Sequence, residues 1–359
     1  MDGRAFVSPA AGVRRYVSEL YGAISEIAPD LRADALGVDS RTTLPSCCRA
    51  VTEWPSPPTN LGRHAVGVPV TLWSHGYDVY HAPAYVGPLW GSVPSVVSIH
   101  DVSYERRPEW YPYKRDAFRR LFYRQAARRA AAVLVPSQFT ARELVAAYDV
   151  PEDLVHVVPL AAAPAFYHHT LPLKPAGGEV RYLLHVGDLH ARRDLDTAVV
   201  ALAELTSRSP LWRLVLIGHD RGVWSGIQEA ARRLRVTGAI EWIPSVTEDD
   251  LLRWYQRAFC LLYPSRYEGF GFPLVEAMAA GLPVVAADAS CTPEVIGAAG
   301  LRFAPGDAGE AASCVTRLLE VDGLWEQQQA AGRVGAARFS WKRTATETLT
   351  VLDAVAGRG

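Results

Sequence analysis

Two glutamates, Glu268 and Glu276, have seven residues between them in a stretch that is mostly apolar or glycine. A carboxylate on an apolar helix is costly to bury unless a partner engages it. If Glu276 is buried, its oxygens can accept a pair of hydrogen bonds from the vicinal hydroxyls of a sugar. The alternative is that Glu276 lies on the exposed side of an amphipathic helix, where single glutamates are usually found. The pair therefore predicts either a site for hydroxyl groups or a solvated helix face.

The residues around these glutamates predict a strand, a glycine turn, a helix and a second strand. Apolar residues 258–263 are typical of a buried strand, and the turn at 268–271 follows it. Pro273 stands in the expected first turn of the helix, and the second strand covers residues 283–287. Such a parallel crossover unit directs backbone N–H groups at a ligand above the strand ends. The N–H groups expected to hold sugar and phosphate oxygens there belong to Phe270, Gly271 and Phe272.

Adjacent arginines occupy a second glycine turn, residues 187–194, which follows another apolar strand. Arg192 and Arg193 can neutralise a phosphate, because a guanidinium group donates to two phosphate oxygens at once. Asp188 subtracts positive charge from the same turn. The cation that would compensate for it is either Arg266 or Arg14.

The same turn holds Asp194 and Asp196 at the spacing of a D-x-D motif, which can bind a divalent metal. Both acids stand at the start of a predicted helix, where carboxylates stabilise the helix dipole. We therefore interpret them as helix-capping acids and predict that no metal is required. The five cysteines include no C-x-x-C pair and no histidine at metal-ligand spacing, so we expect neither a zinc site nor a disulfide framework.

Composition places the chain among ordinary globular proteins. It has 359 residues and a formal net charge of −1, and this balance gives no indication of nucleic-acid binding. No apolar run reaches the roughly 18–20 residues of a membrane span, and the N-terminus lacks the core of a signal peptide. We expect a cytoplasmic protein with possible peripheral contact at the inner membrane face. A basic helix over residues 114–129 would supply that contact, unless it is a solvated face over a core stripe.

Strands and helices alternate in two series, separated by an Ala-, Pro- and Gly-rich linker at residues 161–178. Such alternation predicts an α/β fold with doubly wound parallel sheets. We predict an N-terminal Rossmann-like domain over residues 1–165 and a C-terminal one over residues 178–337, followed by a closing helix over residues 338–359. Residues 40–70 look irregular, with several prolines and a pair of cysteines.

His100 and Gly12 are the candidates for ligand contact in the N-terminal half. The chain begins like the tail of a strand, and Gly12 then lies near the start of a helix. A glycine there lets an anion approach the backbone closely, although glycine is also common at ordinary helix starts. His100 follows the apolar strand 95–99, at the carboxyl end where parallel sheets bind ligands. The alternative is a structural histidine that donates to a backbone carbonyl.

The segment PSRYEGFG…EAMAAGLPVV…PEV resembles, almost residue by residue, the E-x7-E signature of the retaining nucleotide-sugar glycosyltransferases of family 4. The segments HDVSYERRPEW and GDLHARRDLD are similar to the mannosyl- and rhamnosyltransferase branch of that family. The resemblance implies the GT-B fold, in which two Rossmann-like domains face each other. It also implies that the last helix crosses back onto the N-terminal domain.

For the site, the resemblance implies three catalytic residues, Glu268, His100 and Arg193, which act on the donor sugar and its diphosphate. Glu268 would position charge and not attack covalently, because the family retains configuration without a clear protein nucleophile. Glu276 would hold the ribose of the donor. The residues expected to bind the donor are Gly12, Gly187, Arg192, Arg193, Arg266, Gly269, Phe270, Gly271, Phe272 and Glu276.

The expected activity is transfer of a hexose from a GDP-, UDP- or dTDP-linked donor to a hydroxyl acceptor, such as a glycan, a lipid-linked sugar or a secondary metabolite. No cofactor is expected. A non-catalytic sugar-nucleotide-binding subunit is an alternative, as is another enzyme of this fold, such as an epimerase or a phosphorylase. A phosphorylase would need a cofactor lysine, and none of the lysines lies in a glycine-rich C-terminal turn.

Overall fold

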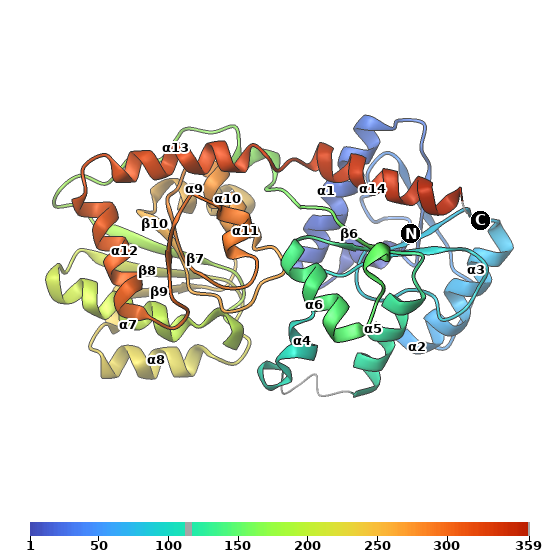
Figure 1. Cartoon of the computed structure of the whole chain (residues 1–359), viewed down its shortest axis with the longest axis horizontal. Helices are drawn as coiled ribbons and strands as arrows, with labels where there is room; N and C mark the ends of the chain where they lie inside the picture. Colours follow the sequence, from blue (N-terminus) through green and yellow to red (C-terminus); the bar gives the residue numbers. More distant parts are fainter. Residues whose placement is uncertain (112–116, 358–359) are drawn as a thin grey trace. The chain divides into compact units, whose positions relative to one another are not determined.

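The computed structural model describes residues 1–111 and 117–357, with the backbone alone for residues 117–119. The chain divides into two compact units (Figure 1). Unit 1 comprises Met1–Leu160 together with the chain from Ser340 onward, and unit 2 comprises Ala161–Phe339. Each unit contains a wholly parallel sheet, which confirms the predicted α/β class. Residues 114–116 of the predicted basic helix lie outside the described residues.

Unit 1 is built on a four-stranded parallel sheet in the order β3–β4–β5–β6. The two inner strands are buried along their whole length, as expected for apolar strands that helices cover on both faces. The strands are β3 (Tyr80–Ala82), β4 (Ser95–Ser98), β5 (Ala132–Val135) and β6 (Val155–Val157).

The start of the chain lies between this sheet and a second, two-stranded sheet of unit 1, which pairs β1 (Ala33–Leu36) with β2 (Cys48–Val51). Leu36 N donates to Met1 O and Asp2 N donates to His81 O, both at 3.0 Å. A 3-10 helix, Gly3–Val7, follows at once. The predicted strand tail is therefore reduced to a single bridge between the two sheets.

Residues 40–70 are more regular than predicted. They contain β2, the short helix α2 (Asn60–Gly62), a π-helical turn (Arg63–Gly67) and the start of α3 (Val68–His75). The prediction was wrong because the chain stays helical across Pro69, which stands just after the π-helical turn and leaves Ala65 O to accept from Trp90 Nε1 at 2.6 Å. Val68 and Leu72 then anchor α3 in the core of unit 1.

The closing helix α14 (Trp341–Ala356) packs beside α1 (Ala11–Ile27) in unit 1 (Figure 1). Val351, Leu352 and Val355 cover β4 and β5, and the Oγ of the predicted cap Ser340 accepts from Arg343 N at 3.2 Å. The other helices of unit 1 are α4 (Ser103–Arg106), α5 (Ala117–Arg129) and α6 (Gln138–Tyr148), with 3-10 turns at Pro108–Trp110 and Glu152–Leu154.

Unit 2 has a six-stranded parallel sheet in the order β12–β11–β10–β7–β8–β9. Its strands are β7 (Arg181–Val186), β8 (Trp212–Ile217), β9 (Ile240–Ile243), β10 (Cys260–Tyr263), β11 (Val284–Ala287) and β12 (Leu301–Phe303). Its helices are α7 (Leu195–Arg208), α8 (Trp224–Arg233), α9 (Glu248–Arg257), α10 (Phe272–Ala280), α11 (Thr292–Ile296), α12 (Ala308–Glu320) and α13 (Leu324–Ala336). Three 3-10 turns complete it, at Pro164–Phe166, Ala191–Arg193 and Thr237–Ala239.

Among the residues that the structure describes, no helix combines the length and apolar character needed to cross a bilayer.

Neutral histidines are buried in the cores of both units. His81 lies in unit 1, between Tyr21 OH (2.9 Å from Nδ1) and Ser98 Oγ (3.0 Å from Nε2), and His185 lies on β7 in unit 2. Burial lowers the pKa of each histidine from 6.5 to about 3. Because the folded pKa lies below the unfolded value, the neutral side chains contribute stability that is complete above pH 6.5. This stability is lost as the pH falls from 6.5 towards 3.

Between pH 7 and pH 5, each of these two histidines should remove about 2 kcal/mol from the free energy of unfolding. His81→Gln and His185→Gln should each lose that share of the pH dependence, because glutamine does not titrate. Urea unfolding followed by circular dichroism at both pH values measures it. His75→Gln, at an exposed position, is the control and should keep the wild-type dependence. The same dependence in all variants would contradict the assignment.

Candidate functional site

The strand order of unit 2 reverses between β7 and β10. From β7 the chain builds outward to β8 and β9, and it then returns to place β10, β11 and β12 on the other side. Open parallel sheets bind ligands outside the carboxyl ends of their strands, at such a switch point. The turn that begins at Gly187 follows β7 directly, and the turn with Glu268 follows β10. Both turns predicted from the sequence therefore meet at this edge.

Three charged side chains from these turns form a compact ion cluster. Arg193 Nη1 lies 2.6 Å from Glu268 Oε1, and Arg192 Nη1 lies 3.5 Å from Glu268 Oε2. Arg193 is 7% exposed and Glu268 is 4% exposed, so solvent screens their attraction weakly. Two arginines against one carboxylate leave a net charge of +1. The cluster therefore favours an anionic ligand.

Residues at the end of β10 hold the Arg193 side chain. Its Nη1 donates to Tyr263 OH and to Ser265 Oγ (3.3 Å), and its Cζ lies 5.1 Å from the centre of the Tyr263 ring. Gly187 has a φ of +127°, and a Cβ at this position would lie 2.8 Å from Arg193 Nη2. Gly187 therefore serves the site by leaving space for the guanidinium group.

Two buried polar atoms of the cluster have no hydrogen-bond partner among the described residues, Arg193 Nε and Glu268 Oε1. Glu268 Oε1 is in charge contact with Arg193 Nη1, but the two groups lack the alignment of a hydrogen bond. Buried polar atoms are normally satisfied, so an exception indicates a place for water or a ligand. A phosphate oxygen can accept from Nε, and a hydroxyl group can donate to Oε1.

Glu276 is buried in α10, which excludes the alternative of a solvated helix face. It is 2% exposed, and its neighbours in α10 from Pro273 to Ala280 are buried as well. Tyr255 OH donates to Glu276 Oε2 at 2.7 Å. Tyr255 lies on α9, 21 residues earlier in the chain, and the sequence analysis did not identify it. Its local pattern is that of a core tyrosine, so no sequence signal could have distinguished it.

The turn between β10 and α10 presents its backbone beside Glu268. Gly271 has a φ of +81°, and a Cβ there would lie 2.9 Å from Leu274 Cδ1. Ser290 Oγ accepts from Glu268 N at 3.0 Å, which fixes the start of the turn. Leu274 N donates to Gly271 O at 2.9 Å, which closes the first turn of α10. The predicted donor-binding residues Gly269, Phe270, Gly271 and Phe272 all stand in this turn or at its junction with α10.

Arg266, which we predicted to bind the donor, is engaged by Asp194. Arg266 Nε donates to Asp194 Oδ2 at 2.8 Å, and Thr197 Oγ1 donates to the same oxygen at 2.9 Å. Asp194 stands at the start of α7 as interpreted, but its carboxylate accepts from these side chains and not from a backbone N–H of the first turn. Asp188 forms an ion pair with Arg221 (2.8 Å). Within the ranges that the structure describes, no three His, Cys, Asp or Glu side chains converge on a metal position.

Among the predicted residues of unit 1, His100 contacts α1, which carries Gly12 and Arg14, and Arg14 donates to Ser8 O. His100 Nε2 lies 2.9 Å from Pro83 O and donates to it, and burial lowers the pKa of this histidine. The ring is therefore neutral, with Nδ1 as an acceptor. Tyr16 packs edge-on against it, with ring centroids 4.8 Å apart, and Gly12 lies one turn earlier in α1. The carbonyl contact is the one expected of a structural histidine, and the contact of His100 with a sugar stays a prediction.

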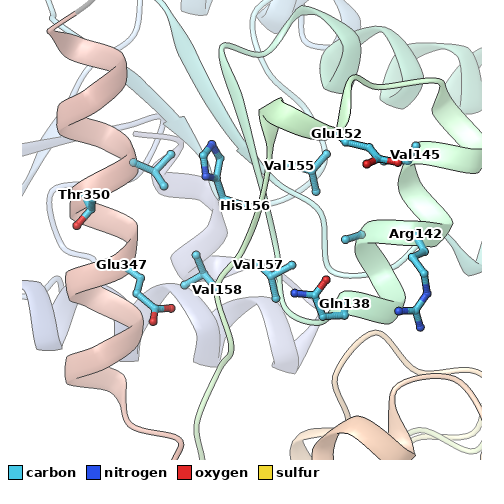
Figure 2. Close-up of a pocket in the computed structure, with 12 residues that line it drawn as sticks. Gln138, Arg142, Val145, Glu152, Val155, His156, Val157, Val158, Glu347 and Thr350 are labelled. Atoms are coloured by element: carbon cyan, nitrogen blue, oxygen red, sulfur yellow. The ribbon is translucent and has the colours of Figure 1, made fainter.

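Unit 1 also contains a cavity of about 580 Å³ at the free edge of β6 (Figure 2). Gln138 and Arg142 approach it from α6, and Glu347 and Thr350 from α14. Neither Gly12 nor His100 lines this cavity. It is therefore separate from the residues that the sequence analysis selected in unit 1.

Two family profiles match this chain. The profile described as "Glycosyltransferase Family 4" matches residues 11–164, and the profile described as "Glycosyl transferases group 1" matches residues 180–321. The first covers most of the chain that builds unit 1. The second contains both turns of the ion cluster.

Curated relatives carry the names of glycosyltransferases. The chain is 28% identical over 286 residues to the O-antigen chain mannosyltransferase B of Escherichia coli. The matched region covers 76% of this chain and 73% of the relative. It is 32% identical over 228 residues to a D-inositol 3-phosphate glycosyltransferase of Frankia alni. The matched region covers 57% of this chain and 54% of the relative. The chain therefore spans about half the length of that second relative.

Solved structures share the fold. A sucrose-phosphate synthase from Thermosynechococcus elongatus superposes with a TM-score of 0.78 at 20% identity, covering 98% of this chain and 95% of the other. The Anabaena HepE protein in complex with UDP and glucose superposes with a TM-score of 0.71 at 20% identity, covering 94% of this chain and 95% of the other. At such low identity the similarity concerns the fold alone.

Gly187→Ala should weaken binding of a nucleoside diphosphate about tenfold or more, because its Cβ displaces the Arg193 guanidinium. Isothermal titration with GDP and UDP measures this loss. Gly222→Ala is the matched control, since Gly222 also has a positive φ (+94°) but its Cβ would meet no atom within 4 Å. Both variants should lose about 1–2 kcal/mol of stability from backbone strain. Equal affinity in both would contradict the role of Gly187.

Proposed function

We propose a function from the fact that this chain belongs to the glycosyltransferases of family 4. It is a retaining, metal-independent enzyme that transfers a hexose from a nucleotide-diphospho-sugar to a hydroxyl acceptor. One observation carries the proposal. A cluster of the buried Arg193 and Glu268 with the half-buried Arg192 stands at the switch point of unit 2, and a second buried glutamate lies on the helix that follows. These groups match the diphosphate, the sugar and the ribose of such a donor.

Glu276 would bind the ribose. A carboxylate can accept hydrogen bonds from both hydroxyls of a cis-diol. The bond from Tyr255 OH to Glu276 Oε2 orients the carboxylate and compensates in part for its burial. A buried glutamate is retained at a cost in stability, so its presence in an otherwise apolar helix supports a ligand role.

Arg192 and Arg193 would neutralise the diphosphate. They supply the positive charge that a metal ion brings in D-x-D enzymes, and charge-assisted hydrogen bonds to phosphate are stronger than neutral ones. The unpartnered Arg193 Nε gives one donor for a phosphate oxygen. The N-terminus of α10 adds backbone N–H groups and the positive end of the helix dipole. Asp194 is occupied by Arg266 and Thr197, which supports a structural role for the D-x-D segment.

The transfer would break the bond between the anomeric carbon and the β-phosphate oxygen. The bond to the acceptor oxygen forms on the same face of the sugar, and the acceptor proton passes to the departing phosphate oxygen. Glu268 is a poor candidate for covalent attack, because arginine nitrogens lie within 3.5 Å of both its oxygens and stabilise the negative charge. We therefore assign Glu268 to positioning the arginines and the hydroxyls of the donor sugar.

The names of some relatives support mannose as the transferred sugar and a glycan as the acceptor, whereas others are named for D-inositol 3-phosphate. One relative is an O-antigen chain mannosyltransferase, and another is an α-(1→4)-mannosyltransferase that is 26% identical over 257 residues. The base of the donor is open among GDP, UDP and dTDP. Thermal-shift measurements with the three nucleotides rank them, because a ligand that binds only the folded protein raises its Tm.

Nucleoside diphosphate release from the preferred donor, in the presence of a glycan acceptor, should continue unchanged in excess EDTA. The reason is that arginines, and no metal ion, carry the neutralising charge in the proposed site. Proton NMR of the product should show the same anomeric configuration as in the donor. A requirement for added Mg²⁺ or Mn²⁺ would contradict metal independence. Binding without hydrolysis or transfer would identify a non-catalytic subunit.

Arg193→Ala should weaken the binding of nucleoside diphosphate, whereas Glu268→Gln should not. Arg193→Ala removes a phosphate contact and should lower the affinity by about tenfold to a hundredfold. Glu268→Gln removes the charge that competes for the arginines, so binding should be unchanged or tighter while transfer falls about a hundredfold or more. Titration calorimetry and product release measure the two effects. Weaker nucleotide binding in Glu268→Gln would contradict the competition of Glu268 with phosphate for the two arginines.

A further inference from the structure

Cys47 and Cys48 are adjacent in the sequence, and their thiols meet in unit 1. Cys47 Sγ lies 3.7 Å from Cys48 Sγ, and both cysteines are reduced. Adjacent residues of a strand direct their side chains to opposite faces, so neighbouring thiols of a regular strand do not meet. Here Cys48 N donates to Pro45 O at 2.8 Å, and the turn that this bond closes places Cys47 just before β2. The turn therefore brings the two thiols together.

The pair lies between α1 and the start of β2. Cys47 Sγ lies 3.4 Å from Tyr21 O, and Cys47 N donates to Ser25 Oγ at 3.1 Å, so two residues of α1 hold Cys47 in place. Cys47 is 3% exposed, whereas Cys48 is only half-buried. Solvent and small solutes therefore reach the pair from the side of Cys48.

Cys47 differs in acidity from the cysteines of unit 2. A hydrogen bond from the Cys48 thiol lowers the pKa of Cys47 to about 6, so the thiolate is populated at neutral pH. Burial raises the pKa of Cys260, Cys291 and Cys314, which therefore stay protonated and unreactive. A reactive thiolate beside a second thiol that can resolve it is the usual arrangement of a redox-sensitive site.

We propose that Cys47 and Cys48 form a peroxide-sensitive modification site, which closes to a disulfide between the two adjacent residues. The Cys47 thiolate attacks one oxygen of hydrogen peroxide. The O–O bond breaks, hydroxide leaves and takes up a proton, and Cys47 becomes a sulfenic acid. The Cys48 sulfur then attacks the Cys47 sulfur, so that the S–S bond forms, the S–O bond breaks and the hydroxyl group leaves as water with the Cys48 proton. Two thiols are oxidised, and one peroxide is reduced to two waters.

Closure of this disulfide should disturb the start of β2. The sulfur atoms must approach from 3.7 Å to about 2.05 Å, which turns the peptide that links the two residues. Cys47 O belongs to that peptide and accepts from Ala33 N at 2.8 Å, at the start of the pairing between β1 and β2. Oxidation should therefore release Ala33 N from its acceptor. The site involves neither donor nor acceptor sugar, so it extends beyond the proposed transfer reaction.

Thiol counting after treatment of the full chain with hydrogen peroxide tests the proposal. The wild-type protein, unfolded and alkylated after treatment, should lose two of its five alkylatable thiols, and dithiothreitol should restore them. Mass spectrometry should show the peptide with both cysteines lighter by two hydrogen atoms.

Two variants sharpen this test. Cys48→Ser should form no such disulfide and should accumulate a sulfenic acid at Cys47, which dimedone traps, because the resolving thiol is absent. Cys314→Ala is the matched control and should close the disulfide like the wild type. Cys314 is also 3% exposed, and its Sγ likewise donates to a backbone carbonyl, that of Arg302 at 3.6 Å.

Three results would overturn the proposal. They are an unchanged thiol count in the treated wild type, a disulfide between two chains on non-reducing electrophoresis, and the same loss of thiols in Cys48→Ser. Hydrogen exchange at Ala33 should be faster in the oxidised protein than in the reduced one, and equal exchange would contradict the turning of the peptide. None of these measurements uses a nucleotide, so their failure is distinct from a failure of the transfer reaction.

Discussion

Arg193 and Glu268 place opposite charges in a buried turn, and neither charge would be stable there alone. Removing one partner of such a pair typically costs about 3–5 kcal/mol, because the other charge stays buried without compensation. Arg192 adds a second cation to the carboxylate, and Tyr263 and Ser265 accept hydrogen bonds from Arg193. The carboxylate therefore assembles the two arginines before any ligand arrives. The geometry of the proposed diphosphate site depends on this attraction.

The attraction depends in turn on the close approach of backbone segments at the strand ends. Gly187 leaves space for the guanidinium group of Arg193. Gly218, at the end of β8, leaves space for Gly187, because a Cβ there would lie 2.2 Å from Gly187 O. Both glycines have φ angles that other residues rarely adopt. Gly218 and Gly187 together therefore set the position of the Arg193 guanidinium group, which the sequence shows only as one member of an Arg-Arg pair.

Local patterns predicted the parallel sheets, the glycine turns and the helix that carries Glu276, because each depends on residues close together in the sequence. The burial of Glu276 could not be predicted in this way, since it is decided by packing and by Tyr255, which reaches it from another helix. The ion pair between Arg266 and Asp194 joins residues 72 positions apart and was equally invisible. The regular elements within residues 40–70 were missed because prolines and glycines obscure their short helices. Pro69 is the second residue of α3 and does not interrupt the helical run that starts at Asn60.

The net charge of the ion cluster also bears on how the proposed site would release a nucleoside diphosphate. An arginine pair without Glu268 would present two unopposed charges and would hold a nucleoside diphosphate tightly after transfer. Glu268 reduces this to +1 and competes with phosphate for the same guanidinium groups. Binding energy that is equal for donor and product does not accelerate the chemical step, whereas charge aimed at the leaving group as its bond breaks does. Glu268 therefore favours turnover, because it holds the arginines in place and at the same time limits how tightly donor and nucleoside diphosphate bind.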